Sequence, residues 1–301
     1  RRAATRLPPA FAADRAGDFY IYNGKKLDLK EKTTEILKSL ATVKNTIMIG
    51  FDQPLSALAN ETSTHTAHSL GGMTALSLIL GNHSAKPLKF VKIEFNHPLF
   101  ILFSSGTTGV PKCITHGHGG TLFQHMKEHQ LHGDIRPLDQ LFYFTTCGWM
   151  MWNWLVTGIS SGANILLYEG APVYKDAKEL FKFLEQHKCT QFGTSAKFID
   201  SCKKANLTPN KDFNLSSMRT VFSTGSPLNE DGFDYVYEHI NPKVQLGSIS
   251  GGTDIIACFV LSNPWTPVIR GEISAAGLAF DMDIWDRSEE RRVGKECRSR
   301  W

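Results

Sequence analysis

The sequence predicts an α/β fold of mostly parallel sheets flanked by helices, on three observations. Short apolar runs rich in β-branched and aromatic residues alternate with stretches of helical periodicity. Strands separated by helices of about 10–15 residues are typical of βαβ units and of parallel sheets. The composition, 42% hydrophobic and 21% charged over 301 residues, is that of a folded globular chain. This length allows one large α/β domain or two ordinary ones.

Each element is expected from its local pattern. The strands are apolar, β-branched or aromatic runs bounded by turn formers: LFILF (99–103), LFYFT (141–145), NILLY (164–168), RTVFS (219–223) and VQLGSIS (244–250). The helices place apolar residues three and four positions apart: 31–40, 119–131, 174–187, 195–204 and 228–240. The polar, histidine-rich stretch 60–88 is expected to be a long surface connection. Because parallel sheets bind ligands beyond the carboxyl ends of their strands, the loops there are candidate sites.

Both ends of the chain are expected to lie outside the fold, which then spans 19–286. Residues 1–18 are rich in alanine and arginine, and 287–301 break in composition from the preceding chain, as a non-native tail would. The formal net charge is +4, but residues 1–6 and 287–301 each contribute +3, which leaves −2 for the body. The body therefore offers no basic face for nucleic acid.

Two further features concern the compartment. No apolar run reaches the roughly 18 residues that a spanning helix needs, so no membrane span is expected. The six cysteines are scattered without CxxC spacing, which favours a reducing, cytoplasmic location over a disulfide framework.

A hydroxyl- and glycine-rich loop follows the first expected strand. It consists of Ser104, Ser105, Gly106, Thr107, Thr108, Gly109, Val110, Pro111 and Lys112. Glycines let the backbone approach an anion closely, the hydroxyl and backbone N–H groups donate hydrogen bonds, and the lysine adds a cation. The spacing differs from that of the Walker A loop, which has four residues between its glycine and Gly-Lys. The helix expected from 119 would add its dipole only if its N-terminus points at the same space.

Four stretches in one order resemble the acyl-adenylate-forming, AMP-dependent synthetase superfamily. They are FSSGTTGVPK (103–112), GWMMWNW (148–154), STGSPL (223–228) and SISGGTDII (248–256). Together with IYNGK (21–25) and KEHQLHG (127–133), the sequences of these stretches are most similar to the acetoacetate-activating branch of the superfamily. The resemblance implies a large N-terminal AMP-binding domain, partial over 19–286, without the family's small C-terminal domain. It implies a ligase that uses ATP, Mg²⁺, coenzyme A and acetoacetate, and a fragment that is inactive alone.

The resemblance also assigns roles to residues. Ser104 to Gly109 with Lys112 would hold the β- and γ-phosphates of ATP, and Gly225, Ser226 and Pro227 would line the adenine. Gly252 and Thr253 would face the α-phosphate, and Asp254 would hold Mg²⁺, a cation that prefers oxygen ligands. Lys112, Thr253 and Asp254 are the expected catalytic residues. Asp254 stands where the family more often has glutamate, and Ser250 where it often has an aromatic residue.

The acyl pocket is expected between Trp149, Met150, Met151 and Gly251. In acetate-activating relatives a tryptophan occupies the position of Gly251, so the glycine would widen the pocket for a four-carbon 3-keto acid. Two alternatives stay open: another short- or medium-chain acyl-CoA synthetase, and a catalytically silent nucleotide-binding homologue. His125, His129 and His132 share one helical face at a spacing that suits zinc, but bordering apolar residues favour half-buried, hydrogen-bonded histidines instead.

Overall fold

The computed structural model describes residues 13–40, 43, 45–50, 73–104, 111–174 and 176–283. The chain divides into two compact units rather than one: Arg1–Val91 with Glu169–Ala171, and Lys92–Tyr168 with Pro172–Trp301. They are described separately below.

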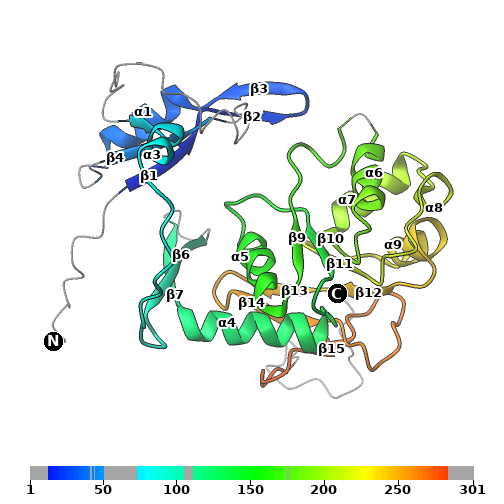
Figure 1. The fold of residues 1–301 in the computed structure, drawn as a ribbon. Coiled ribbons are helices and arrows are strands. Elements are labelled where there is room, and N and C mark those ends of the chain that lie inside the picture. Colours follow the sequence, from blue (N-terminus) through cyan, green and yellow to red (C-terminus); the bar gives the residue numbers. More distant parts are fainter. Residues whose placement is uncertain are drawn as a thin grey trace. The chain divides into compact units, whose positions relative to one another are not determined.

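The smaller unit holds a parallel sheet and a hairpin (Figure 1). The sheet order is β1–β4–β5, the hairpin pairs β2 with β3, and helices α1 and α3 complete the unit. The bounds are β1 Ala13–Gly17, β2 Phe19–Tyr22, β3 Lys25–Asp28, α1 Lys30–Lys38, β4 Asn45–Ile49, β5 Met73–Ala75 and α3 Leu76–Gly81. Asn23 and Gly24 join the hairpin with positive φ angles, as a two-residue type I′ turn requires.

Three sequence-based expectations concern residues of the smaller unit. The helix expected at 31–40 is confirmed as α1. The surface connection expected over 60–88 is wrong where β5 and α3 form, because Met73–Ala75 pairs in parallel with β4; residues 51–72 lie outside the described residues. Ala13–Gly17, which we placed in the N-terminal end, forms β1 beside β4.

The larger unit is built on a five-stranded parallel sheet in the order β12–β11–β10–β8–β9. The bounds are β8 Gln140–Tyr143, β9 Asn164–Leu166, β10 Gln191–Ser195, β11 Thr220–Thr224 and β12 Gln245–Ser248. Four of these strands confirm expected ones. The central β10 was not expected, because its sequence QFGTS contains a single large apolar residue.

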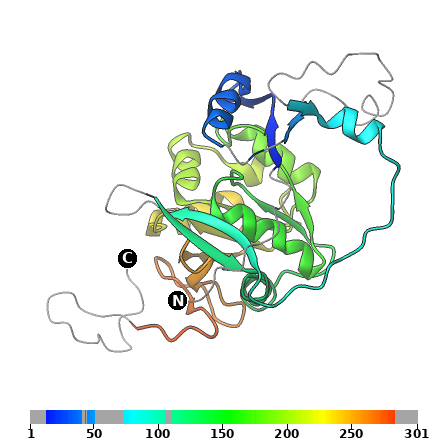
Figure 2. The same ribbon diagram turned by 90° about the vertical axis from the view of Figure 1, so that its left-hand side faces the viewer.

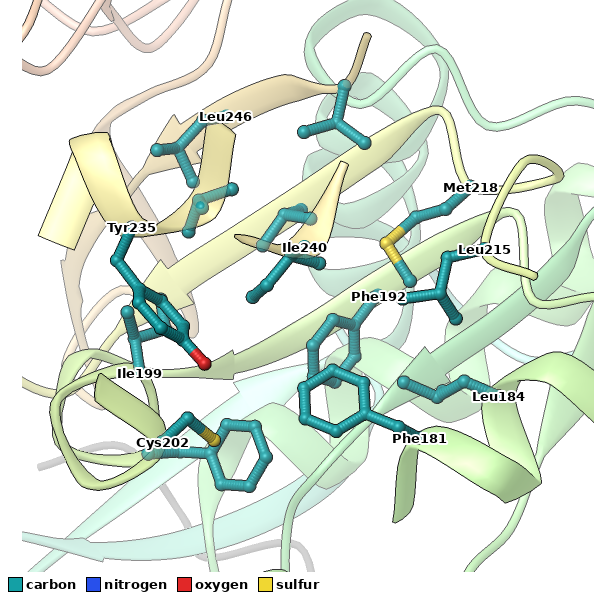
Figure 3. Packing of buried hydrophobic residues seen from close by; sticks show 14 of the residues in the cluster. Phe181, Leu184, Phe192, Ile199, Cys202, Leu215, Met218, Tyr235, Ile240 and Leu246 are labelled. Atoms are coloured by element: carbon teal, nitrogen blue, oxygen red, sulfur yellow. The ribbon is translucent and has the colours of Figure 1, made fainter. Parts of the chain in front are cut away.

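Alternate residues of the strands face two helical layers, as the period of a strand dictates. Phe142 and Phe192 belong to a core cluster that also contains residues of α6 Lys178–Gln186, α7 Ala196–Lys204, α9 Glu230–Tyr235 and η3 Val236–Ile240. Figure 3 shows Phe192 among its neighbours in this cluster. Leu141, Tyr143 and Phe222 join the second cluster, with α5 Met150–Thr157. The remaining short helices are η2 Gly158–Ser161 and α8 Pro209–Asp212. Both faces of the sheet are therefore covered, which explains its apolar strands.

A long antiparallel hairpin precedes this sheet in the chain (Figure 2). It pairs β6 Pro98–Ser104 with β7 Lys112–Gly117, and it leads into α4 His118–Lys127 and η1 Glu128–His132. The strand expected at 99–103 is confirmed as β6, but it pairs in an antiparallel hairpin instead of in the parallel sheet. Only residues 105–111 separate the two strands, which is too short for a parallel crossover of a dozen or more residues. α4 starts directly after Gly117, at the opposite end of β7 from Lys112.

A small antiparallel sheet completes the larger unit. It comprises β13 Ser250–Gly252, β14 Ala257–Leu261 and β15 Ala275–Ala276. The expected strand 244–250 is therefore shorter, because the chain leaves the parallel sheet after Ser248 and pairs with β14. In the described part of the chain, no helix is both long and apolar enough to span a bilayer.

Candidate functional site

A cavity of about 390 Å³ lies at the carboxyl ends of β11 and β12. Thr224 and Ser248, the last residues of these strands, both line it. This is the edge at which parallel α/β sheets bind ligands. The volume lies in the lower part of the range of small-molecule sites, about 300–1,000 Å³.

Nine predicted site residues line this one cavity. They come from three stretches that are far apart in the sequence: Trp149, Met150 and Met151; Gly225, Ser226 and Pro227; Gly251, Gly252 and Thr253. The expected acid-binding and adenine-binding stretches thus share a single space. The fold achieves this by bringing the N-terminal end of α5 over the ends of β11 and β12.

The other predicted residues lie elsewhere. Asp254 follows Thr253 on an exposed turn and is not part of the lining. Ser104 and Lys112 are paired across the end of the β6–β7 hairpin, with Lys112 exposed. Ser105, Gly106, Thr107, Thr108 and Gly109 lie outside the described residues.

Several lining residues were missed by the sequence analysis: Thr224, Leu228, Ser248, Ile249, Ala257, Cys258, Gly271 and Ile273. Thr224 and Ser248 could have been found as strand ends. The Thr224 hydroxyl donates to the Ile249 carbonyl at 2.9 Å, which ties the two strand ends together. Gly271 and Ile273 come from the segment between β14 and β15, where the sequence carries no motif.

The turn after β11 requires its glycine. Gly225 has φ +86°, a conformation that residues with a Cβ rarely adopt. The chain then enters α9, whose N-cap is Asn229: its side chain accepts from the Gly232 N–H at 2.9 Å. Ser226 does not cap this helix and lines the cavity instead.

Gly251 lines the cavity for a reason other than the expected one. A Cβ on Gly251 would overlap the Ala257 carbonyl oxygen and lie 2.8 Å from Cys258 Cα. Its missing side chain therefore points at β14 instead of into the cavity. At the neighbouring Gly252, a Cβ would find its nearest atom 3.8 Å away, in the Phe259 ring. The close approach of β14 is what demands glycine at Gly251.

Two histidines hold the turn 253–256 that carries Thr253 and Asp254. His116 of β7 donates from Nε2 to the Thr253 carbonyl at 2.9 Å, and His125 of α4 donates from Nε2 to the Ile256 carbonyl at 2.7 Å. Burial lowers the pKa of His125 to about 4, so this histidine is neutral at physiological pH. Since a carbonyl only accepts, Nε2 carries the proton.

Glu128 joins two walls of the cavity from behind. Its buried carboxylate accepts from Trp154 Nε1 at 2.9 Å and from the Cys258 N–H at 2.8 Å, and also from Gln124 Nε2 at 3.0 Å. Trp154 belongs to α5 and Cys258 to β14. Burial raises the pKa of this carboxyl above its usual value, against the effect of these donors.

The histidine stripe is a packed one. His125 also contacts the Thr157 hydroxyl, and His132 donates from Nδ1 to the Ser262 carbonyl at 2.8 Å, so hydrogen-bonded histidines are confirmed at these two positions. Both are fully buried instead of half-buried as expected. His129 differs: neither ring nitrogen makes a hydrogen bond of normal geometry, and the ring lies edge-on to Trp154, with centroids 4.2 Å apart. Within the described ranges, no group of three or more metal-ligating side chains is present.

A family model described as AMP-binding enzyme matches residues 17–297. The chain belongs to the AMP-binding enzyme family. It is 50% identical over 269 residues to an acetoacetyl-coenzyme A synthetase of Rhizobium meliloti (strain 1021), covering 89% of this chain and 40% of that protein. It is 42% identical over 266 residues to the acetoacetyl-CoA synthetase of Gallus gallus, covering 88% and 39%.

A solved structure agrees with these relatives. The acetoacetyl-CoA synthetase from Streptomyces lividans superposes with a TM-score of 0.81 at 35% identity, covering 94% of this chain and 42% of that one. The chain thus spans about two fifths of the length of the relatives it matches.

Proposed function

We propose that the protein to which this chain belongs is an acetoacetate–CoA ligase. The observation that carries this proposal is the single cavity that Trp149–Met151, Gly225–Pro227 and Gly251–Thr253 line together. A ligase that joins an acid to a nucleotide needs both to share one space, because the reacting atoms must be held within about 3–3.5 Å of each other. The acetoacetyl-CoA synthetases among the relatives supply the identity of the acid.

The proposed reaction has two steps. An oxygen of the acetoacetate carboxylate attacks the α-phosphorus of ATP, the bond to the β-phosphate oxygen breaks, and pyrophosphate leaves with the electron pair. The thiol sulfur of coenzyme A then attacks the carbonyl carbon of the adenylate, the carbon–oxygen bond to AMP breaks, AMP leaves with the electron pair, and the thiol proton is released. Neither step changes an oxidation state, so the protein contributes positioning and charge stabilisation.

In this proposal, different residues of the cavity contact different parts of the substrates. The turn at Gly225–Pro227 offers backbone polar groups to the adenine, and the Thr253 hydroxyl donates to the α-phosphate. Met150 and Met151, which are buried, supply an apolar, adaptable wall for the acid. Lys112 with Ser104–Gly109 would neutralise the phosphates that leave as pyrophosphate.

We infer that Asp254 would hold a magnesium ion. Asp254 is exposed on the turn beside Thr253, so its carboxylate is accessible to an ion. A free carboxylate is the hard oxygen ligand that Mg²⁺ prefers. When bound there, the ion would offset the charge that builds up on the phosphates.

We also propose a cytosolic location. The buried thiols of Cys189, Cys202 and Cys258 are free, which supports it, because free thiols are typical of a reducing compartment.

The test is pyrophosphate release by the whole protein with acetate, butyrate and acetoacetate. We expect kcat/KM for acetoacetate to exceed the other two by at least tenfold. Equal rates with butyrate would instead indicate a short- or medium-chain acyl-CoA synthetase. ATP binding without pyrophosphate release from any acid would indicate a silent nucleotide-binding homologue. The 301-residue chain, assayed alongside, is expected to be inactive.

The magnesium assignment has its own matched pair of variants. Asp254→Asn should raise the Mg²⁺ concentration needed for half-maximal rate by at least tenfold. Asp281→Asn removes an exposed carboxylate that does not line the cavity and should leave the Mg²⁺ requirement unchanged. An unchanged Mg²⁺ requirement in Asp254→Asn would refute the assignment.

A further inference from the structure

The turn 253–256 accepts a side-chain hydrogen bond at each end, from His116 and from His125. His116 belongs to the β6–β7 hairpin, which also carries Lys112. We propose that His116 is a positioning residue, which holds Thr253 and Asp254 in register with the hairpin that carries Lys112. The proposal rests on the proposed function for its catalytic consequence. Its structural part stands on the geometry alone.

The first step is the face of β7 on which His116 lies. Side chains alternate along a strand, so Lys112, Ile114 and His116 share one face. Their partners in the hairpin register are Ser104, Leu102 and Phe100. Phe100 and Leu102 pack against the core cluster that contains Met150 and Cys258. This face of the hairpin therefore packs on a core cluster that shares Met150 and Cys258 with the cavity lining, and His116 on the same face contacts the turn.

The second step is the reach along the strand. Lys112 and His116 are four residues apart, which corresponds to about 14 Å at the rise of an antiparallel strand. The His116 bond to the Thr253 carbonyl is 2.9 Å long and joins segments 137 residues apart in the sequence. It is thus a direct link between the hairpin and the backbone of a residue whose side chain lines the cavity.

The third step is that the turn needs to be held. Ile256 has φ +50°, an unfavourable conformation for a β-branched residue. His125 fixes its carbonyl at that end. At the other end, the Thr253 carbonyl accepts from His116 and from the Ile256 N–H at 3.3 Å. Among the described residues, loss of His116 would leave the Thr253 carbonyl with this long bond within the turn, and the hydrogen bond between Thr253 and β7 would be lost.

The effect should fall on geometry more than on folding. His116 is half-buried at the edge of the larger unit, so its loss opens no core cavity. His97, just before the same hairpin, provides a matched control: it is exposed, its Nδ1 lies 3.0 Å from the neighbouring Pro98 carbonyl, and its ring meets the His118 ring edge-on with centroids 5.6 Å apart. Neither contact reaches the turn 253–256.

The experiment compares three variants of the whole protein: His116→Leu, which removes the donor at similar volume; His116→Gln, which keeps an N–H donor; and His97→Leu. One hydrogen bond corresponds to about fivefold to tenfold in rate. We expect His116→Leu to lower kcat for acetoacetate-dependent pyrophosphate release by that factor with little change in melting temperature. His116→Gln should recover to within threefold of wild type, and His97→Leu should match wild type.

Hydrogen exchange at the Ile256 amide gives a readout that needs no activity. In His116→Leu this amide should exchange several-fold faster than in wild type, and in His116→Gln it should not. If wild type releases no pyrophosphate, the proposed function fails while exchange still decides the positioning. Wild-type exchange in His116→Leu, an equal effect of His97→Leu, or no rescue by glutamine would overturn the proposal. Should His116→Leu fail to fold, His116→Asn, whose amide is too short to reach Thr253, takes its place.

Discussion

Adjacent glycines in β13 allow a sharp test of why the cavity wall has its present backbone. Gly251→Ala places a Cβ against the Ala257 carbonyl oxygen and 2.8 Å from Cys258 Cα, so β13 or β14 must shift. Overpacking of this kind costs about 1–3 kcal/mol. For a folded unit of this size, 1 kcal/mol corresponds to about 2–4 °C in melting temperature. We expect Gly251→Ala to melt roughly 3–10 °C below wild type.

Gly252→Ala is the matched control, because its Cβ has 3.8 Å to the nearest atom and its φ is not positive. Its melting temperature should stay within about 1–2 °C of wild type. Differential scanning calorimetry of both variants at neutral pH measures the difference. Equal melting temperatures for Gly251→Ala and Gly252→Ala would refute the steric account, and the explanation of Gly251 by a widened pocket would then regain its force.

Three further predictions concern buried polar groups. Burial lowers the pKa of His129 to about 3 in the folded protein. As pH falls below about 6.5, the His129 imidazole is therefore protonated in the unfolded chain but not in the folded one, and the free energy of unfolding declines from there toward pH 3. His129→Phe should flatten that decline and leave stability at pH 7 unchanged or higher; melts between pH 4 and pH 7 measure both, and a lower stability at pH 7 would contradict it. Burial opposes ionisation of Asp139, but hydrogen bonds led by Arg219 outweigh it and lower the pKa of that carboxyl, which adds stability that is lost as pH falls below about 4. Asp139→Asn should therefore lower the melting temperature at pH 7 and have less effect at pH 3, whereas equal effects at the two pH values would exclude the ion pair as the cause. Glu128→Gln leaves one acceptor oxygen for two donors, Trp154 Nε1 and the Cys258 N–H, and should lower the free energy of unfolding in urea at pH 7 by about 1–3 kcal/mol. An unchanged urea midpoint would show that the protein does not need this bridge between the two cavity walls.

Much of the site was accessible from the sequence because its residues lie in short stretches of local character. Gly225 marks a turn, and Thr224 and Ser248 end apolar strands whose carboxyl edges bind ligands. The helical spacing of His125 and His132 beside apolar residues indicated packed histidines. These features depend on neighbours a few residues away, so local pattern is sufficient to find them.

The pairing of strands was not accessible in this way. The pattern at 99–103 indicates a strand but does not name its partner, and the partner is β7 instead of the parallel sheet. β10 is the central strand of the sheet, although its sequence has almost no strand signal. It is held in place by its neighbours β11 and β8, one on each side. Strand partners are decided by contacts between residues distant in the chain.

By itself, the sequence determined the α/β class, the buried faces, and the stretches whose glycines, hydroxyls and carboxylates suit a nucleotide. Only the tertiary structure decided that three of these stretches line one cavity, that Gly251 faces β14, and that His116 reaches Thr253. The physical reason is range. Backbone preference and side-chain period act over a few residues, whereas a cavity and its supports arise where segments more than a hundred residues apart pack together.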